Sequence, residues 1–509
     1  MKNKKKAISK TVATILMVLL MVLTVSMPAG ASTSTVTGTE RIGVLVVAHG
    51  STSEWCDSIR SAVADANLDG YPVEIGFLEN VDNETIPDAV ERLDEQGVTR
   101  IVAVPMFISS SSGHISEIEY ILGLTDDAPE EGLVQADTDA EIIFTDAMND
   151  HSFIAEVIAD RAAKLIADAD NETVVIVFHG TTDEHLEGWI KSSSSLADKT
   201  KLILRHSMGI TVEDVRYCFI NVNGDATDYK IGNVVSDVSH TSHPVVIPAF
   251  VGEGYYTNTK IPSLLSGMDY SYPEKGERSL IPHSRIGDWL EATVAKEVSC
   301  PVISIYDGDE IVEISQEDLE EGCLCSACAY MSSLYAFSYG DVWDGIPRRG
   351  DLSIISAHPS DGHEEVFLHM ILDNLGEDYT VSIPEGTDMK HIVPQNYNYT
   401  FIQKSSGDYI NIRVKEEVFP ESMFELRTKA QLGAASPEQK KAFQLLKSIV
   451  LERMLYSPSE ELFDATVVLS GGSSDPSQPP AEQIPEFPTI ILPVAAVIGL
   501  ALIFQRKRA

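Results

Sequence analysis

A histidine followed by glycine ends two separate apolar runs of this chain, and no other repeated pattern in it suggests chemistry so directly. The sequence VLVVAHGST at residues 44–52 puts His49 at the end of a predicted strand, and VVIVFHGTT at residues 174–182 does the same for His179. Side chains at the carboxyl ends of parallel strands face the edge where open α/β sheets hold their ligands. An imidazole there is placed to bind a ligand, although it can instead cap a helix or bond to a carbonyl group.

Two further landmarks follow each histidine in the same order, which indicates an internal duplication. A Pro-x-Phe sequence closes an apolar run at residues 105–107 and again at residues 248–250. The sequences HSFI at residues 151–154 and HSRI at residues 283–286 each open a predicted helix, with the serine as the expected N-cap. The chain therefore contains two homologous lobes, which we place at residues 42–168 and 172–298.

Both lobes alternate short runs rich in valine and isoleucine with amphipathic segments, such as IPDAVERLDEQG at residues 86–97. This alternation predicts βαβ units, parallel sheets and a doubly wound α/β fold. In the first lobe, the small-residue loop ISSSSG at residues 108–113 lets the backbone approach a flat ligand and leads into His114. We therefore expect His49 and His114 at the same edge of the first sheet.

The first lobe resembles the CbiX-type class II chelatases, which insert cobalt, nickel or iron into sirohydrochlorin. The resemblance rests on the turn at His49, GFLEN at residues 76–80, PMFISSSSGH at residues 105–114 and DHSFIAEVIADR at residues 150–161. The second lobe resembles the family more loosely. In that family two histidines, at the positions of His49 and His114 here, hold the metal ion, so the resemblance implies this role for them.

The expected reaction explains these residue types. Neutral imidazoles bind Co²⁺, Ni²⁺ and Fe²⁺ well, and a site with two of them leaves positions open, so that the ion can be handed on. Metal insertion also releases two pyrrole protons, which a carboxylate near the ring can accept as a general base. Glu79, at the end of the second predicted strand, is our candidate for that base, although acidic residues at strand ends are often only solvated.

The second lobe departs from this pattern. Counting from the shared Pro-x-Phe, Thr257 falls where His114 stands, so the lobe keeps His179 as a candidate metal ligand without a partner histidine. We expect it to be half-active or purely structural. His240 and His243 precede a predicted strand and would lie at the opposite edge of a parallel sheet.

A third part of the chain clusters soft metal ligands. Cys323, Cys325 and Cys328 are half of the six cysteines and lie within six residues, and His358 and His363 follow in a loop after an apolar strand. Such residues favour a zinc ion or an iron–sulfur centre. In an exported protein a disulfide is the competing interpretation.

This part resembles the FmdE family, which takes its name from a component of formylmethanofuran dehydrogenase. The resemblance rests on GIPRRGDLSIISAHPSDGHEEVF at residues 345–367 and KAQLGAASPEQKKAFQLL at residues 429–446, and it covers about residues 318–458. It implies an α+β metal-binding domain that could be linked to redox chemistry, rather than a specified reaction.

The amino-terminal region has the three parts of a secretory signal. Five lysines precede an apolar run from Val12 to about Val25, and Ala29-Gly30-Ala31 offers a cleavage site. We therefore assign residues 1–31 to a signal peptide and expect the protein to be exported.

The carboxyl-terminal region begins with a predicted linker at residues 470–484, which is too poor in apolar residues to fold. PEFP, a short apolar run and a basic cluster follow at residues 485–509. This arrangement resembles the archaeal PEF-CTERM sorting signal, which implies processing by an archaeosortase-type enzyme in the membrane. A plain transmembrane anchor is the alternative, and both predict attachment at the outer face of an archaeal cell membrane.

The formal net charge of −40 argues against a nucleic-acid partner. It would also repel a polycarboxylate such as sirohydrochlorin, unless basic side chains line the site. Two hypotheses follow. The chain is either an exported chelatase that inserts Co²⁺, or Ni²⁺ or Fe²⁺, into a tetrapyrrole, or a surface protein that binds cobalt, nickel or a tetrapyrrole without turnover. An interaction or structural role with vestigial sites is a third interpretation.

Overall fold

The structure is a computed structural model, and it describes residues 41–79, 81–181, 183–222, 226–298, 302–319 and 322–470. The predicted signal peptide, the linker from residue 471 onward and the sorting signal lie outside the described residues. Within the part that is described, no helix combines the length and the apolar character needed to cross a bilayer.

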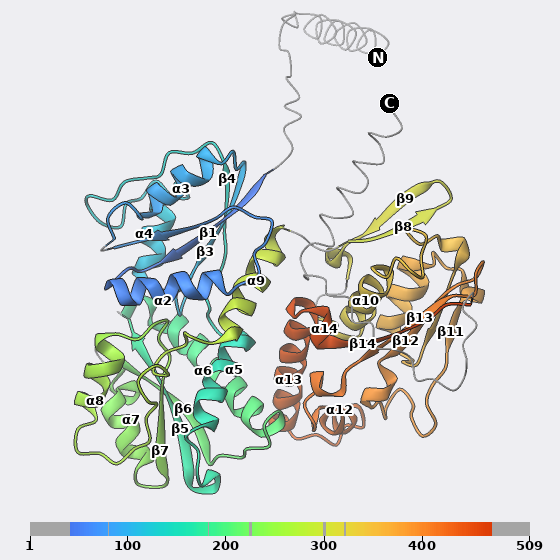
Figure 1. Ribbon diagram of the computed structural model, residues 1–509. Coiled ribbons are helices and arrows are strands. Elements are labelled where there is room, and N and C mark those ends of the chain that lie inside the picture. Colours follow the sequence, from blue (N-terminus) through green and yellow to red (C-terminus); the bar gives the residue numbers. More distant parts are fainter. Residues whose placement is uncertain are drawn as a thin grey trace, which may run out of the picture. The chain divides into compact units, whose positions relative to one another are not determined.

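The first lobe, in which Figure 1 labels β1, β3 and β4, is built on a parallel sheet with the strand order β2-β1-β3-β4. Its strands are β1 (Ile42–Ala48), β2 (Val73–Phe77), β3 (Arg100–Pro105) and β4 (Glu141–Phe144). Its helices are α2 (Ser53–Ala64), α3 (Ile86–Glu95), α4 (Gly113–Ile121) and α5 (Ser152–Ala163). Strand β1 is apolar along its whole length because both faces are covered: Leu45 belongs to the core beneath α3 and α4, and Val46 to the core beneath α2.

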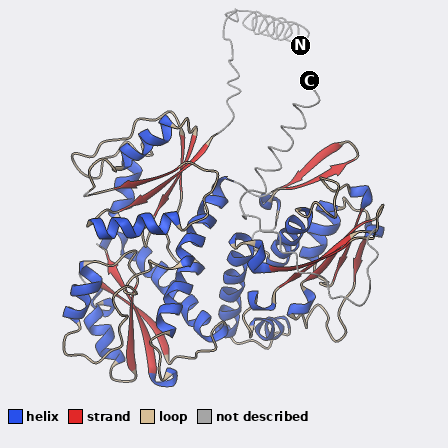
Figure 2. Cartoon of the chain, in the orientation of Figure 1, coloured by secondary structure: helices blue, strands red, loops and turns tan. Residues whose placement is uncertain are grey.

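The second lobe repeats this plan, which confirms the predicted α/β class with parallel sheets (Figure 2). Its three parallel strands have the order β6-β5-β7, in which β5 takes the central place of β1. The strands are β5 (Glu172–Gly180), β6 (Asp214–Asn221) and β7 (His243–Pro248). The helices are α6 (Leu186–His206), α7 (Ile231–Val238), α8 (Ile261–Leu264) and α9 (Ser284–Val298).

The two lobes exchange their last helices. Helix α5, which follows the first sheet in sequence, packs against β7 of the second sheet, and α9 packs back against β3 and α2 of the first. Several polar contacts join the exchanged helices and the segment before α9. Arg161 donates to the carbonyl group of Pro282 at 2.6 Å, His283 Nε2 lies 2.9 Å from Asp160 Oδ2, and Arg285 Nε lies 2.8 Å from Glu156 Oε2. The sheet of each lobe therefore packs with a helix that the sequence-based boundaries assign to the other lobe. The boundaries in sequence do not coincide with the packing of the helices.

The caps of α5 and α9 differ from the prediction. His151, rather than Ser152, is the N-cap of α5, and its Nδ1 accepts a hydrogen bond from the Phe153 backbone at 3.3 Å. His283 accepts in the same way from Arg285 at 3.2 Å. Prediction of a serine cap was wrong here because the ring nitrogen of the preceding histidine already satisfies the free backbone N–H.

The remaining part is α+β, as predicted. Its main sheet has the order β11-β10-β12-β13-β14, in which only β10 and β11 are parallel. The strands are β8 (Ile303–Asp307), β9 (Glu310–Ile314), β10 (Leu352–Ser356), β11 (Tyr379–Val381), β12 (Asn398–Gln403), β13 (Tyr409–Val414) and β14 (Phe463–Val468). The helices are α10 (Leu324–Phe337), α11 (Asp361–Glu364), α12 (Met423–Gln431), α13 (Pro437–Tyr456) and α14 (Ser459–Leu462). Because β14 pairs with β13, the sheet continues past residue 458.

The turn after β1 requires glycine for two reasons. Gly50 has a φ of +87°, and a Cβ atom there would lie 1.8 Å from the carbonyl oxygen of Glu79. Gly180 repeats both features at the end of β5, with a φ of +88° and a Cβ position 2.0 Å from the Asn221 carbonyl oxygen. The backbone that follows each histidine is therefore packed directly on the backbone that follows the neighbouring strand.

We expect Gly50→Ala to lower the free energy of unfolding far more than Gly70→Ala. Gly70 has a similar φ of +99° but no atom within 4 Å of its Cβ position, so its substitution should cost only about 1 kcal/mol of backbone strain. Gly50→Ala should cost at least about 2 kcal/mol more, because backbone must also move. Urea unfolding of the two variants measures the difference, and equal losses would show that the contact with Glu79 does not constrain the turn.

Candidate functional site

His49 lies where β1 ends, and its ring is held in one orientation by the backbone. Its Nδ1 lies 2.7 Å from the carbonyl oxygen of Gly50. The carbonyl can only accept, so Nδ1 carries the proton and Nε2 keeps its lone pair. This tautomer is the one that a metal ligand binding through Nε2 requires.

His114 comes from the first turn of α4, after the serine-rich loop. Its Nδ1 lies 3.3 Å from Oε2 of Glu117, one turn further along the helix. A carboxylate that accepts from Nδ1–H leaves Nε2 free and makes the ring a better ligand. The His114 side chain is 41% exposed, whereas that of Glu117 is 17% exposed, so the carboxylate supports the ring from the protein side.

The two imidazoles form a pair, as the sequence predicted. Their ring centroids are 4.8 Å apart with an interplanar angle of 85°. Phe107, at the end of the Pro-x-Phe landmark, packs against both rings with centroid distances of 6.5 Å and 6.1 Å. Two partly exposed, oriented imidazoles against an apolar wall can hold one transition-metal ion and leave its other positions to a second ligand.

The loop that carries His114 is tied to the start of the exchanged helix. The Ser110 backbone donates to Asn149 Oδ1 at 2.8 Å, and Asn149 Nδ2 donates to Ser110 Oγ at 2.9 Å. Asn149 has a φ of +45°, a conformation that asparagine tolerates better than most residues. These contacts hold the loop in a fixed position over the sheet edge.

Glu79 lies two residues past the end of β2, next to His49. Its backbone N–H donates to the His49 carbonyl group at 2.8 Å, and the residue is exposed. The carboxylate is thus attached to the same sheet edge as the imidazole pair.

The second lobe places a different trio at the same three positions. His179 corresponds to His49, and its Nδ1 lies 2.9 Å from the Gly180 carbonyl oxygen. Asn221 corresponds to Glu79 and places its Nδ2 3.2 Å from His179 Nε2. Tyr256 stands where His114 stands, with centroids 4.7 Å apart and an interplanar angle of 81° to His179.

The counterpart of His114 is therefore Tyr256 and not Thr257, which is buried and bonded to the Gly254 backbone. Tyr256 lies eight residues after Pro248, whereas His114 lies nine after Pro105, so the second loop reaches the strand end one residue earlier. Counting along the sequence cannot detect such a change in loop geometry.

His179 shares its surroundings with the first lobe's pair. Burial lowers its pKa below the ordinary value; the hydrogen bond to the Gly180 carbonyl opposes this, and the nearby His114 and His49 act in the same direction as burial. His179 is therefore neutral near pH 7. Among the described residues the three do not meet as one compact ligand group.

The predicted cysteine and histidine cluster also comes together in part. Cys325, His358 and His363 have ligand atoms that all lie within 4.8 Å of one another. The two imidazole rings are stacked, with centroids 4.1 Å apart. Cys328 is buried and is not a member of this compact group. Cys323 is the N-cap of α10 and lies beside Cys325.

Protonation of the two histidines and of Cys323 suits metal binding, whereas Cys325 must lose its proton to bind an ion. A hydrogen bond from the Cys325 thiol lowers the pKa of Cys323 to about 5, and the same bond with burial raises that of Cys325. Burial lowers the pKa of His358 to about 3 and holds that of His363 well below its usual range. Both imidazoles are therefore neutral at pH 7, which is the form that binds metals.

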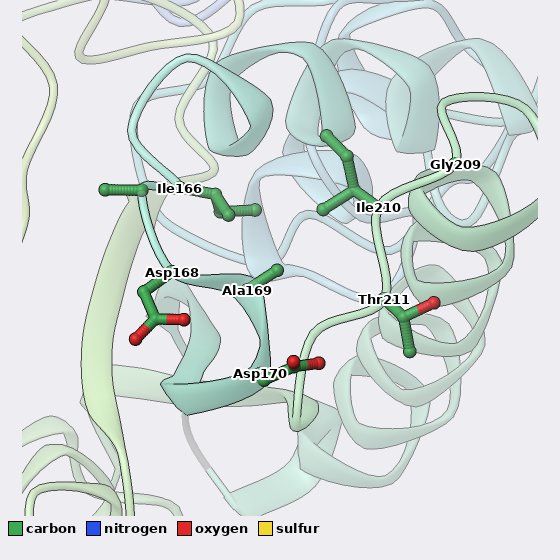
Figure 3. A pocket seen from close by; sticks show the side chains of 8 residues that line it. Ile166, Asp168, Ala169, Asp170, Gly209, Ile210 and Thr211 are labelled. Atoms are coloured by element: carbon green, nitrogen blue, oxygen red, sulfur yellow. The ribbon is translucent and has the colours of Figure 1, made fainter.

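A separate hollow in the second lobe belongs to neither site. Residues 166–170 and 209–211 line it (Figure 3). These segments precede β5 and β6, so the hollow lies at the amino-terminal edge of the second sheet, opposite the edge that holds His179. His243 is the first residue of β7 and therefore lies at the same amino-terminal edge as the hollow, away from His179, as predicted.

Three residues at the sites were missed by the sequence reasoning. Glu117 is three residues after His114 on a predicted helix, a spacing that could have identified it. Asn221 could have been found by aligning the ends of β2 and β6. Tyr256 carried no signal, because its place depends on the path of a loop.

Comparison with known proteins finds relatives of the first lobe. Residues 43–165 match the family model of CbiX. A sirohydrochlorin cobaltochelatase of Methanothermobacter thermautotrophicus is 31% identical over 137 residues, which cover 25% of this chain and 94% of that protein. A sirohydrochlorin cobaltochelatase of Methanococcoides burtonii is 31% identical over 132 residues, which cover 25% of this chain and 98% of that protein.

Among solved structures, the one titled SirB from Bacillus subtilis with Fe³⁺ is similar at 17% sequence identity, with a TM-score of 0.38, over 50% of this chain and 97% of that one. At the other end, residues 484–508 match the family model of the PEF-CTERM archaeal protein sorting domain. That domain indicates export and surface attachment. The resemblance of residues 318–458 to FmdE stays a prediction.

We expect Glu117→Gln to weaken Co²⁺ binding at the His49 and His114 pair by about 10-fold to 100-fold, because the carboxylate orients His114 and increases its basicity. Titration of the chain with Co²⁺ measures this. Glu119→Gln is the matched control, since residue 119 points to another face of α4. Equal affinities for both variants would exclude a supporting role for Glu117.

Proposed function

The chain belongs to the CbiX family of chelatases, and from this premise we propose that its first lobe inserts Co²⁺, with Ni²⁺ or Fe²⁺ as alternatives, into a tetrapyrrole of the sirohydrochlorin class at the outer cell surface. The observation that carries the proposal is the pair of His49 and His114, whose Nδ1 atoms are both engaged and whose Nε2 atoms have no hydrogen-bond partner among the described residues. The similarity to sirohydrochlorin cobaltochelatases supports the choice of cobalt and of this substrate.

The proposed reaction exchanges two protons for one metal ion. The two Nε2 atoms hold the divalent ion, which is a substrate, and leave coordination positions open for the ring nitrogens of the tetrapyrrole. As these nitrogens bind the ion, their two protons must leave. Glu79 is the proposed acceptor, because its backbone bond to His49 fixes the start of its side chain at the same edge. Phe107 supplies an apolar surface behind the ion.

The second lobe is proposed to support the reaction rather than to repeat it. Asn221, in place of Glu79, cannot accept a proton at neutral pH, and Tyr256 replaces the second imidazole. His179 remains a proposed metal ligand, but weaker than His49, because its Nε2 is already hydrogen-bonded to Asn221.

A surface protein that binds cobalt, nickel or a tetrapyrrole without turnover is the second candidate. The formal net charge of −40 favours it, because such a surface repels a polycarboxylate substrate. The predicted signal peptide, the PEF-CTERM match and processing by an archaeosortase-type enzyme fit either candidate. In both, the mature protein is attached at the outer face of an archaeal membrane.

An anaerobic spectral assay of the chain with sirohydrochlorin and Co²⁺ tests the proposal. We expect metal insertion above the spontaneous rate, and at least about a 100-fold loss in His49→Ala and in His114→Ala, because each removes a metal ligand. His179→Ala should reduce the rate about 5-fold or less, and His240→Ala, an exposed residue of the second lobe, should leave it unchanged. No acceleration by the unmodified chain, with Co²⁺ binding that still needs both histidines, would replace the chelatase by the binding protein.

Glu79→Gln separates the base from the ligands. We expect kcat to fall by about 100-fold or more, since proton acceptance is lost, while Co²⁺ affinity stays within about 2-fold. Asp82→Asn, a nearby exposed acid, is the control for loss of one negative charge. A parallel loss of Co²⁺ affinity in Glu79→Gln would instead make Glu79 a metal ligand.

A further inference from the structure

The cluster of Cys325, His358 and His363 contains a buried polar group that the protein itself does not satisfy. His358 is completely buried, and neither of its ring nitrogens has a hydrogen-bond partner. Leaving a buried polar atom unpaired is costly, and native proteins seldom do so. The lone pair of a ring nitrogen buried in this way needs a partner, and a transition-metal ion provides one by accepting electron density from nitrogen.

His363 is oriented by two hydroxyl groups. Ser360 Oγ lies 2.7 Å from Nδ1, and Tyr399 Oη lies 2.6 Å from Nε2. Ser360 also contacts the Cys325 thiol. One hydroxyl group can keep its hydrogen bond to the ring while an ion replaces the other hydroxyl group at the second ring nitrogen. A metal-bound histidine usually has such an arrangement, with one nitrogen on the metal and the other hydrogen-bonded.

The spacing of the ligand atoms fits one ion. The three residues have ligand atoms within 4.8 Å of one another, and a tetrahedral zinc ion with bonds of about 2.0–2.3 Å separates its ligand atoms by roughly 3.3–3.8 Å. The cluster therefore needs to contract only slightly. A binuclear iron–sulfur centre with the same ligand types puts thiolates and imidazoles on different irons, which would separate them further.

Cys323, like Cys328, lies outside the compact group of three, but it is hydrogen-bonded to one of its members and is the candidate for a fourth ligand. It is hydrogen-bonded to Cys325, and both sulfur-bearing side chains lie against Gly362. A Cβ atom on Gly362 would be 3.0 Å from Cys323 Sγ and 3.1 Å from Cys325 Cβ, so the glycine gives the two cysteines room next to the histidine loop. Cys323 and Cys325 are partly exposed and the histidines are buried, which leaves the cysteine side as the entry path for an ion.

We propose that Cys323, Cys325, His358 and His363 bind one resident zinc-type divalent ion in a tetrahedral site that joins the start of α10 to the segment after β10. With four protein ligands the site has no open position, so the ion is structural and does not take part in metal insertion. Cys328 is excluded from the ligand set. The site is independent of the chelatase proposal, because it shares no residue with the His49 and His114 pair.

The test measures metal content of the full chain in a background that carries His49→Ala and His114→Ala, so that the first lobe does not contribute. After dialysis against a weak chelator, we expect about one zinc ion per chain and no sulfide. His358→Ala and Cys325→Ser should each weaken zinc binding at least 10-fold, whereas Cys328→Ser should retain the ion. Circular dichroism checks that the variants are folded.

A second measurement avoids any change at the ligands. X-ray absorption of the chain in that background should give two sulfur and two nitrogen neighbours around zinc. Gly362→Ala should weaken binding at least 10-fold, while Gly340→Ala, which has open space around its Cβ position, should not. A chain without bound metal, zinc with no sulfur neighbour, two iron and two sulfide ions per chain, or retention in both His358→Ala and Cys325→Ser would each overturn the proposal.

Discussion

The close packing of one backbone on another at the ends of β1 and β2 is the constraint on which the first site depends. The carbonyl oxygen of Glu79 occupies the space that a side chain at residue 50 would fill, and the Glu79 N–H bonds to the carbonyl group of His49. This contact fixes His49 at the sheet edge, and the Gly50 carbonyl then selects the protonation of its ring. A metal-binding imidazole needs both its place and its tautomer set in advance, and a backbone provides both without a flexible side chain.

The duplication shows what the same backbone does with other side chains. The turn after β5 repeats the contact between residue 180 and the Asn221 carbonyl, and the His179 ring meets Tyr256 at nearly the geometry of the first pair. The edge positions thus keep their geometry while their chemistry changes from carboxylate to amide and from imidazole to phenol. A duplicated lobe can therefore keep the same edge geometry with a different set of side chains.

Exchange of α5 and α9 makes the two lobes one folding unit. Each sheet is covered on one face by a helix that follows the other sheet in sequence, and buried contacts such as Arg161 with the Pro282 carbonyl join the two. Because the lobes are packed together by this exchange, the electrostatic surroundings of His179 depend on both lobes. The third part of the chain has its own sheet and its own cluster of ligands around His358.

Sequence alone determined the elements and the kind of chemistry. Apolar runs that end in histidine and glycine predict parallel strands with the histidine side chains at one edge of the sheet. They do so because strand periodicity and the access of glycine to positive φ are local properties of the chain. The pair of His49 and His114 was therefore predictable, and so was the clustering of cysteines with histidines. Tertiary structure decided which of these residues meet. Tyr256 rather than Thr257 faces His179, Cys325 rather than Cys328 joins the two buried imidazoles, and α5 crosses to the other sheet. Loop path, helix exchange and burial depend on contacts between segments far apart in the chain, and no local pattern of residues encodes them.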